Sequence, residues 1–149
     1  MRFSAKGEYG VRAILDIALY GESGPVRVKE IARRQAIPKR FLEQVMTSLK
    51  QAGLVESYRG AHGGYRLKKS AKDINLADVI QAVEGPITVM ECINEKDKGL
   101  CDQISVCVIR DIWCDVQRSV IKSLSAVTLE SVIKKKQKRE STQAPVYQI

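Results

Sequence analysis

The sequence predicts a mainly α-helical protein with one small β-hairpin, and three observations lead to this fold class. Residues 28–35 and 39–52 place apolar side chains at helical spacing on either side of Pro38, which breaks the helix. Residues 54–67 form two β-prone stretches around a glycine-rich turn. Residues 106–126 are again periodic, and a helix of that length spans roughly 30 Å. This order predicts a winged helix-turn-helix head with a β-hairpin wing, followed by a long C-terminal dimerisation helix.

The head is expected to have a three-helix core. Ser4 can cap a first helix that runs to about Tyr20, while Gly21 and Gly53 are placed to stop the first and third helices. The second helix should expose Lys29, Arg33 and Arg34. The apolar faces expected to be buried are Tyr9, Ala13, Ile14, Ile17 and Ala18 in the first helix, Val28, Ile31 and Ala32 in the second, and Phe41, Leu42, Val45, Met46 and Leu49 in the third.

The chain divides into four predicted parts. Residues 1–85 make the DNA-binding head, which ends with a helix at 76–83 that Asn75 can cap. Residues 86–107 form a loop that contains cysteines, and residues 108–136 contain the dimerisation helix and a short terminal helix. Residues 137–149 form a polar, basic tail that is predicted to be disordered.

The distribution of charge points to a nucleic-acid partner. Residues 1–70 contain 14 Lys and Arg against 6 Asp and Glu, a net +8 that equals the charge of the whole chain. The positive field therefore lies on the head, where phosphate binding requires it. The Lys39 end of the third helix is expected to enter a major groove, with the wing on the neighbouring phosphates or minor groove. A small α/β domain with an incidental basic helix is the alternative.

Nothing in the sequence indicates secretion or a membrane. The apolar run near the N-terminus is interrupted by Asp16, and nowhere do 18 apolar residues follow one another without a break. We therefore expect a cytoplasmic protein whose four cysteines are reduced, metal-binding or redox-sensing rather than disulfide-bonded.

Three cysteines define the second informative stretch. Cys92, Cys101 and Cys107 are separated by eight and five residues, in a region from Glu91 to Asp115 that contains six acidic and three basic residues. Three thiolates on one loop can converge on a soft metal centre, either an iron-sulfur cluster or zinc. Buried cysteines that act as small apolar side chains are the alternative, which three cysteines in a polar loop make awkward.

The long C-terminal helix predicts a homodimer. Its apolar side chains recur in a heptad-like pattern and exceed what one small head can cover, so pairing with a second copy is the natural solution. Two heads on a two-fold axis would bind a pseudo-palindromic operator in double-stranded DNA. The residues of this pattern are Val108, Ile109, Ile112, Val116, Val120, Ile121 and Leu124.

The sequence also resembles a known family. The opening MRFSAKGEYGVRAILDIAL, the phrase IPKRFLEQVMTSLKQAGLVESYRGAHGGYRL, the helix INLADVIQAVEG, the cysteine loop and the closing TLESV are together similar to the IscR and NsrR branch of the Rrf family of bacterial transcription regulators. The resemblance covers residues 1 to about 133 and implies a homodimeric winged-helix regulator with an iron-sulfur cluster, 2Fe-2S in preference to 4Fe-4S. By position, it implies Cys92, Cys101 and Cys107 as cluster ligands and Arg40, Gln44 and Arg59 as DNA contacts.

Two departures from the family pattern leave the fourth ligand open. IscR-like members have a histidine three residues after the third cysteine, whereas this chain has Arg110, a cation that cannot ligate iron. The loop between the first two cysteines is also longer than usual. Candidate fourth ligands are Glu8 first, because related members use an acidic residue there from the partner subunit, then Glu43 and Cys114. The single histidine, His62, lies in the predicted wing and is expected to contact DNA instead.

The sequence thus predicts a DNA-binding transcriptional regulator, expected to be a repressor, whose cluster reports iron-sulfur supply, oxidants or nitric oxide. The alternative is a cluster-free regulator of the same family, controlled by a protein partner or a small-molecule signal. An enzyme is not expected, because the sequence offers no nucleophile with a paired base and no phosphate-cradling loop.

Overall fold

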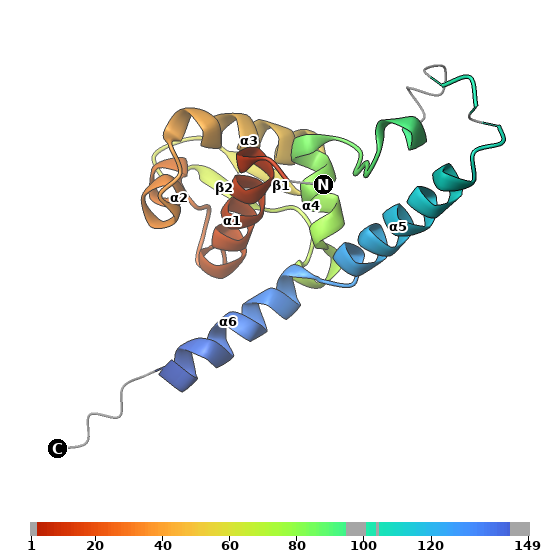
Figure 1. Cartoon of the computed structure of the whole chain (residues 1–149). Helices are drawn as coiled ribbons and strands as arrows, with labels where there is room; N and C mark the ends of the chain where they lie inside the picture. The colour runs from red at the N-terminus through yellow and green to blue at the C-terminus, as the bar shows by residue number, and fades with distance from the viewer. Residues whose placement is uncertain (1–2, 95–100, 104, 144–149) are drawn as a thin grey trace.

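The computed structural model describes residues 3–94, 101–103 and 105–143 (Figure 1). The head contains helices α1 (Ala5–Tyr20), α2 (Val28–Gln35), α3 (Lys39–Gln51) and α4 (Leu76–Glu84), with strands β1 (Val55–Tyr58) and β2 (Gly64–Leu67) between α3 and α4. Two short 3₁₀ helices, η1 (Ala71–Asp73) and η2 (Glu91–Ile93), lie before and after α4. The chain continues with α5 (Val108–Ser125) and α6 (Leu129–Gln143), which follow one another along one side of the head. The predicted fold class is confirmed.

Local sequence signals set the helix ends. The Ser4 hydroxyl accepts hydrogen bonds from the backbone N–H groups of Lys6 and Gly7, which would otherwise lack partners at the start of α1. The Asn75 side chain caps α4 by accepting from the Asp78 N–H. Just after α3, Gly53 adopts a φ of 72°, which suits glycine because it has no Cβ.

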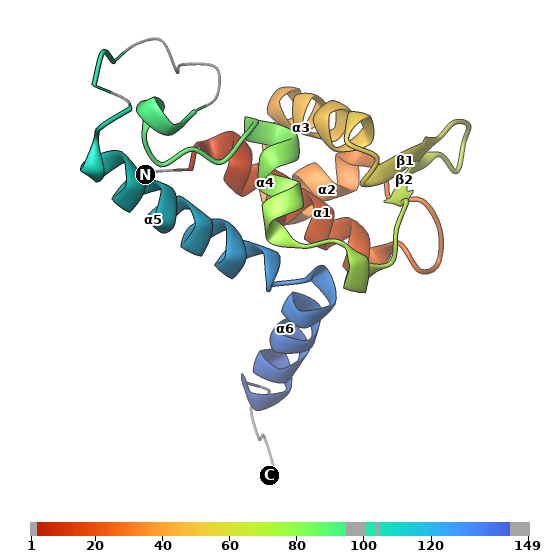
Figure 2. The same cartoon turned by 90° about the vertical axis from the view of Figure 1, so that its right-hand side faces the viewer.

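The wing is a two-stranded antiparallel hairpin. Its register runs from Val55 opposite Leu67 to Tyr58 opposite Gly64. Val26 forms an isolated antiparallel bridge with Tyr65, so the segment just before α2 pairs with the wing. In Figure 2 the hairpin projects from the side of the head opposite to α5.

The core is aliphatic, and side chains from α1 to α4 and β1 pack in it together with Leu129 at the start of α6. The Leu129 N–H donates to the Ile74 carbonyl at 2.9 Å, and the Leu76 N–H donates to the Val127 carbonyl at 2.9 Å, so the α5–α6 junction is attached to the head. Ile74 is fully buried, although residues 68–73 just before it are mostly polar. The fully buried apolar side chains of the described residues are Ala13, Ile14, Ile17, Ile31, Leu42, Val45, Met46, Leu49, Val55, Ile74, Val79 and Leu129.

A buried carboxylate is the main feature of the core that the sequence did not predict. Asp16 is fully buried in α1 and accepts hydrogen bonds from Arg34 at 2.7 and 3.0 Å and from the Gln35 amide at 2.9 Å. The Arg34 guanidinium also lies 4.1 Å from the centre of the Tyr20 ring. Hydrogen bonding to Asp16 raises the pKa of Arg34, although burial opposes the shift. The prediction that Arg34 points into solvent was therefore wrong, because a partner in another helix draws it inward.

Phe41 also differs from its prediction. Its side chain is 52% exposed in the first turn of α3, where it lies beside the Tyr9 ring with 6.4 Å between the ring centres. The helical pattern placed Phe41 on the buried face, but the core of the head is filled by side chains further along α3. It therefore forms an apolar edge to the exposed surface of this helix.

The two C-terminal helices also depart from the sequence pattern. No residue of α5 is buried in the single chain, although Val120, Ile121 and Leu124 pack against Ala77 and Ile80 of α4. Helix α6 continues to Gln143, so the prediction of a disordered tail from residue 137 was wrong as far as 143, and the rest of that tail lies outside the described residues. Pairs four residues apart, Lys134 with Glu130 and Lys136 with Glu140, support the extra turns.

Among the helices of the described ranges, none has the length and apolar character needed to cross a membrane.

Candidate nucleic-acid interface and cysteine site

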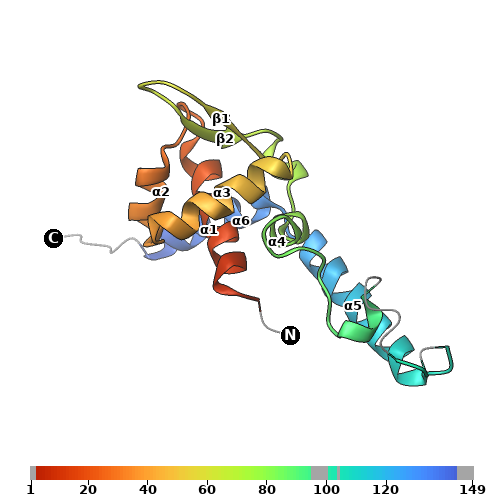
Figure 3. The same ribbon diagram turned by 90° about the horizontal axis from the view of Figure 1, so that it is seen from above.

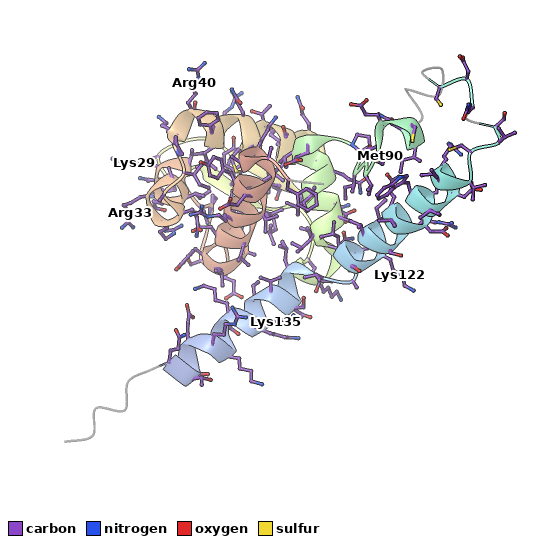
Figure 4. The ribbon with its side chains drawn as sticks, in the orientation of Figure 1. Lys29, Arg33, Arg40, Met90, Lys122 and Lys135 are labelled. Atoms are coloured by element: carbon purple, nitrogen blue, oxygen red, sulfur yellow. The ribbon has the colours of Figure 1, made fainter. Side chains whose placement is uncertain are left out.

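The exposed face of α3 carries the residues predicted to read DNA. Lys39, Arg40 and Gln44 are all exposed, because the opposite face of the helix is packed into the core. Figure 4 shows Arg40 pointing away from the head, with Lys29 and Arg33 of α2 also projecting outward. The Lys39 ammonium lies 3.7 Å from the Glu43 carboxylate, and both side chains are mostly exposed. Such a surface pair is weak, so it leaves Lys39 available to a phosphate.

The wing supplies the second part of this interface. Arg59 and His62 are exposed in the turn between β1 and β2. The turn is held close to the start of α2, because the Arg27 side chain donates a hydrogen bond to the Ala61 carbonyl. Gly64 is required at the base of the wing, since its φ is 156° and a Cβ there would lie 2.4 Å from the Val26 carbonyl oxygen. No pattern in the sequence had indicated this role for Arg27.

The three predicted ligand cysteines all lie near the N-terminal end of α5. Cys92 is half-buried in η2, Cys101 is exposed, and Cys107 is the half-buried residue that precedes the first turn of α5. Cys92 and Cys101 line one pocket of about 540 Å³ together with Val89, Met90 and Glu91. The structure therefore brings two of the three thiols to a common pocket and places the third at the adjoining helix end.

These thiols do not form a closed coordination sphere in the single chain. Across the part of the chain that the structure describes, no three side chains of His, Cys, Asp or Glu lie close enough together to hold a metal ion. The donor chemistry nonetheless suits a soft metal centre, because thiolates are the preferred protein ligands of iron-sulfur clusters.

The candidate fourth ligands lie elsewhere. Glu8 is exposed in the first turn of α1 and forms an ion pair of 3.2 Å with Arg12. Glu43 is exposed on α3, and neither carboxylate lines the pocket of Cys92 and Cys101. Cys114 is half-buried on α5, two turns beyond Cys107. Neither of the two head carboxylates therefore lies at the pocket of Cys92 and Cys101 in its own chain.

Two polar side chains of α5 contact the segment that leads to Cys92. The Gln117 side-chain oxygen accepts a hydrogen bond from the Val89 N–H at 3.1 Å, and the Arg110 Nε donates to the Cys92 carbonyl at 3.4 Å. The sequence drew attention to Arg110 only as a departure from the family pattern, and it gave no sign of Gln117. These contacts join residues far apart in the chain, so no local pattern could have revealed them.

Comparison with known proteins gives consistent results. A model of the Rrf2 family, described as an iron-dependent transcriptional regulator, matches residues 3–135. The HTH-type transcriptional regulator IscR of Klebsiella pneumoniae is 38% identical over 133 residues, which are 89% of this chain and 80% of that protein. The solved structure of T. potens IscR matches with a TM-score of 0.77 and 34% identity over 99% of this chain and 95% of the other. The structure of CymR, the global cysteine regulator of B. subtilis, matches with a TM-score of 0.73 and 31% identity over 91% of this chain and 98% of the other.

Proposed function

Because the chain belongs to the Rrf2 family of transcriptional regulators, we propose that it is a DNA-binding repressor whose affinity for its operator depends on an iron-sulfur cluster. The similar proteins named above are transcriptional regulators and not enzymes, and this chain is likewise a regulator. We place it in the cytoplasm. The observation that carries the cluster proposal is the pocket shared by Cys92 and Cys101, next to Cys107 at the start of α5.

In this proposal the DNA contacts come from α3 and the wing. Lys39, Arg40 and Gln44 lie on the exposed face of α3, with Arg59 and His62 in the turn of the wing. Arginine can bond two acceptors of a guanine at once, and glutamine can do the same with an adenine, so α3 supplies groups for direct readout of base edges. The wing supplies a cation and an imidazole for the phosphates or the minor groove.

The cluster would be held by Cys92, Cys101 and Cys107, with Glu8 of a second subunit as the first candidate for the fourth ligand. An oxygen ligand would leave one iron more open to attack than four thiolates would, which suits a sensor. We favour 2Fe-2S over 4Fe-4S, in line with the family resemblance. When bound, such a group supplies a centre that responds to oxidants, nitric oxide or iron-sulfur supply.

We propose a homodimer because α5 exposes several large apolar side chains. Val108, Ile109 and Ile112 are 71%, 63% and 56% exposed in the single chain. Further along, Val116 and Val120 line an apolar groove of about 630 Å³ together with Phe3. A contiguous apolar face of this kind on a small protein is normally covered by a partner. A second copy would cover it and would set two heads on a pseudo-palindromic operator.

A cluster-free regulator is the second candidate. The observation in its favour is that no three ligand side chains converge within the described residues, and the CymR structure is similar to this chain over most of its length. In that case a protein partner or a small molecule would set the affinity for DNA, and the thiols would hold no iron.

Anaerobic reconstitution with iron and sulfide distinguishes the two candidates. We expect Cys92→Ala, Cys101→Ala and Cys107→Ala each to abolish visible absorbance and bound iron, because each removes a thiolate ligand. Glu8→Ala should weaken or alter the absorbance, and Cys114→Ala is the matched control that should leave it intact. DNA binding is then measured for the loaded and the metal-free protein.

The outcomes separate the candidates clearly. If the Cys101→Ala and Cys107→Ala variants bind as much iron as the wild type, Cys101 and Cys107 are not ligands of the cluster. Identical operator binding by the loaded and metal-free protein would exclude the sensor mechanism and favour the cluster-free regulator.

A further inference from the structure

The segment of residues 86–93, which we call the strap, connects the end of α4 to Cys92. It lies against the N-terminal half of α5, as Figures 1 and 2 show. Ile87 and Ile93, near its two ends, are only 6% and 7% exposed, so apolar burial holds it at both ends. The strap is therefore a packed element of the structure, although it forms only one short turn of helix.

Two side chains of α5 fix the backbone of the strap between these apolar ends. Gln117 accepts from the Val89 N–H, and Arg110 donates from Nε to the Cys92 carbonyl. Residues 110 and 117 are seven apart, so they lie on one face of the helix, two turns from each other. One face of α5 thus holds the strap at two points about 10 Å apart along the helix axis.

The contact from Arg110 also joins two of the cysteines. Arg110 lies three residues after Cys107 and therefore on the same face of α5, one turn away. Its bond to the Cys92 carbonyl holds the backbone of Cys92 against the first turn of that helix. Cys101 is exposed, whereas Cys92 and Cys107 are both half-buried.

We propose that Arg110 and Gln117 are positioning residues that hold Cys92 on α5 beside Cys107 before any metal is bound. At position 110 the family resemblance leads one to expect a histidine that ligates the cluster. In this chain, Arg110 would instead orient another ligand, Cys92. The consequence for iron binding rests on the function proposed above, but the positioning of Cys92 in the metal-free protein does not.

Charge provides a competing explanation that can be tested separately. A guanidinium near thiols and acidic residues can act through its charge alone, without fixing the backbone. Gln117 carries no charge, and it acts on the same strap through Val89. If positioning is the cause, the loss of either side chain should loosen Cys92, whereas a charge effect would be confined to Arg110.

The test uses the metal-free, reduced, full-length protein. Amide hydrogen exchange reports the Val89 N–H directly, and the rate of alkylation by iodoacetamide, read by mass spectrometry, reports the accessibility of each thiol. One hydrogen bond contributes about 0.5 to 1.5 kcal/mol net, which corresponds to about a two- to tenfold change in local opening. We expect that increase for Val89 exchange in Gln117→Ala and for Cys92 alkylation in both Gln117→Ala and Arg110→Ala, with Cys101 unchanged.

Arg118→Ala is the matched control. Arg118 is an exposed arginine of the same helix that pairs with Asp115, so its loss should leave Cys92 and Val89 at wild-type rates. Wild-type rates of Cys92 alkylation in Arg110→Ala, or an increase in Arg110→Ala that is absent in Gln117→Ala, would overturn the positioning role. Thermal unfolding of each variant checks that the fold is retained.

Reconstitution of the same variants tests the consequence for iron. Arg110→Ala and Gln117→Ala should take up less iron than Arg118→Ala under identical conditions. If the wild-type protein takes up no iron, the proposed function fails, while the alkylation and exchange rates still decide whether Arg110 and Gln117 position Cys92.

Discussion

At the scale of single residues, Asp16 shows how a polar group can connect helices inside an aliphatic core. Among the described residues, Asp16 is the one charged residue buried in the core. Its carboxylate accepts hydrogen bonds from both Arg34 and Gln35 at the end of α2. A buried charge of this kind is tolerated only when it is paired and hydrogen-bonded. The first and second helices of the head are therefore joined by a polar contact as well as by apolar packing.

We expect Asp16→Ala to lower the free energy of unfolding by about 3 to 5 kcal/mol, because it leaves Arg34 partly buried without its partner. The measurement is urea denaturation, with Glu22→Ala, the loss of an exposed carboxylate just after α1, as a control that should change stability by less than about 0.5 kcal/mol. The pKa of Arg34 is raised above its ordinary value, so its contribution to stability is fully present below that ordinary value and is lost as the pH rises through the folded-state pKa. The part of the difference in unfolding free energy between wild type and variant that comes from Arg34 should therefore not diminish between about pH 7 and about pH 10. An Asp16→Ala protein as stable as the wild type would show that the contact between Asp16 and Arg34 does not stabilise the head.

The exposed residues of α3 and the wing that are predicted to contact DNA should affect DNA binding and leave stability nearly unchanged. We expect Gln44→Ala and Arg59→Ala each to weaken specific operator binding by about 1 to 3 kcal/mol, because each loses contacts to bases or phosphates. Both side chains are exposed, so thermal stability should hardly change. Gln137→Ala and Arg139→Ala, on the exposed surface of α6, are the matched controls in the same gel-shift titration. Wild-type affinity in both test variants would contradict the assignment of this face.

At the scale of elements, local sequence signals predicted the head well. The caps at Ser4 and Asn75 and the stop at Gly53 act through neighbouring backbone groups, so the ends of α1, α3 and α4 lie within one residue of their predicted positions. The wing was likewise predictable from its alternating strands and glycine-rich turn. The exposed face of α3, and with it half of the candidate site, follows from helical periodicity alone.

Features that depend on distant partners were not predictable. The burial of Asp16 needs Arg34, which lies 18 residues further along the chain, and the fixing of the strap needs Gln117, which lies 28 residues from Val89. The extension of α6 to Gln143 depends on ion pairs within a segment whose composition is typical of disorder. Spacing predicted the three cysteines as a group, but it could not predict how far a single chain brings them together.

At the scale of the whole molecule, the reading surface and the cysteine site are far apart within one chain. The wing and the N-terminal end of α5 lie at opposite ends of the molecule in Figures 2 and 3. A change at the cysteines can alter DNA binding only if it acts on an element that has two arrangements. The strap connects the cysteines to α4 of the same head.

Under the proposed function, the dimer is the feature through which we expect the two sites to communicate. Val116 is 38% exposed and lines the apolar groove of about 630 Å³ on α5. If a second copy covers this groove, Val116→Asp would bury an unpaired charge, which costs several kcal/mol. We expect monomers or aggregates in analytical ultracentrifugation and loss of binding to a pseudo-palindromic site.

Lys122→Asp is the control for this prediction, because it places the same carboxylate on α5 outside the groove, where Figure 4 shows the side chain projecting from the helix. It should leave the sedimentation of the dimer unchanged. Binding to a single half-site, which requires only one head, should persist in any soluble Val116→Asp monomer. A Val116→Asp protein that sediments as a dimer and binds the full site with wild-type affinity would show that α5 does not form the interface, and the cysteines would then have to act on DNA binding through the strap and the head of their own chain.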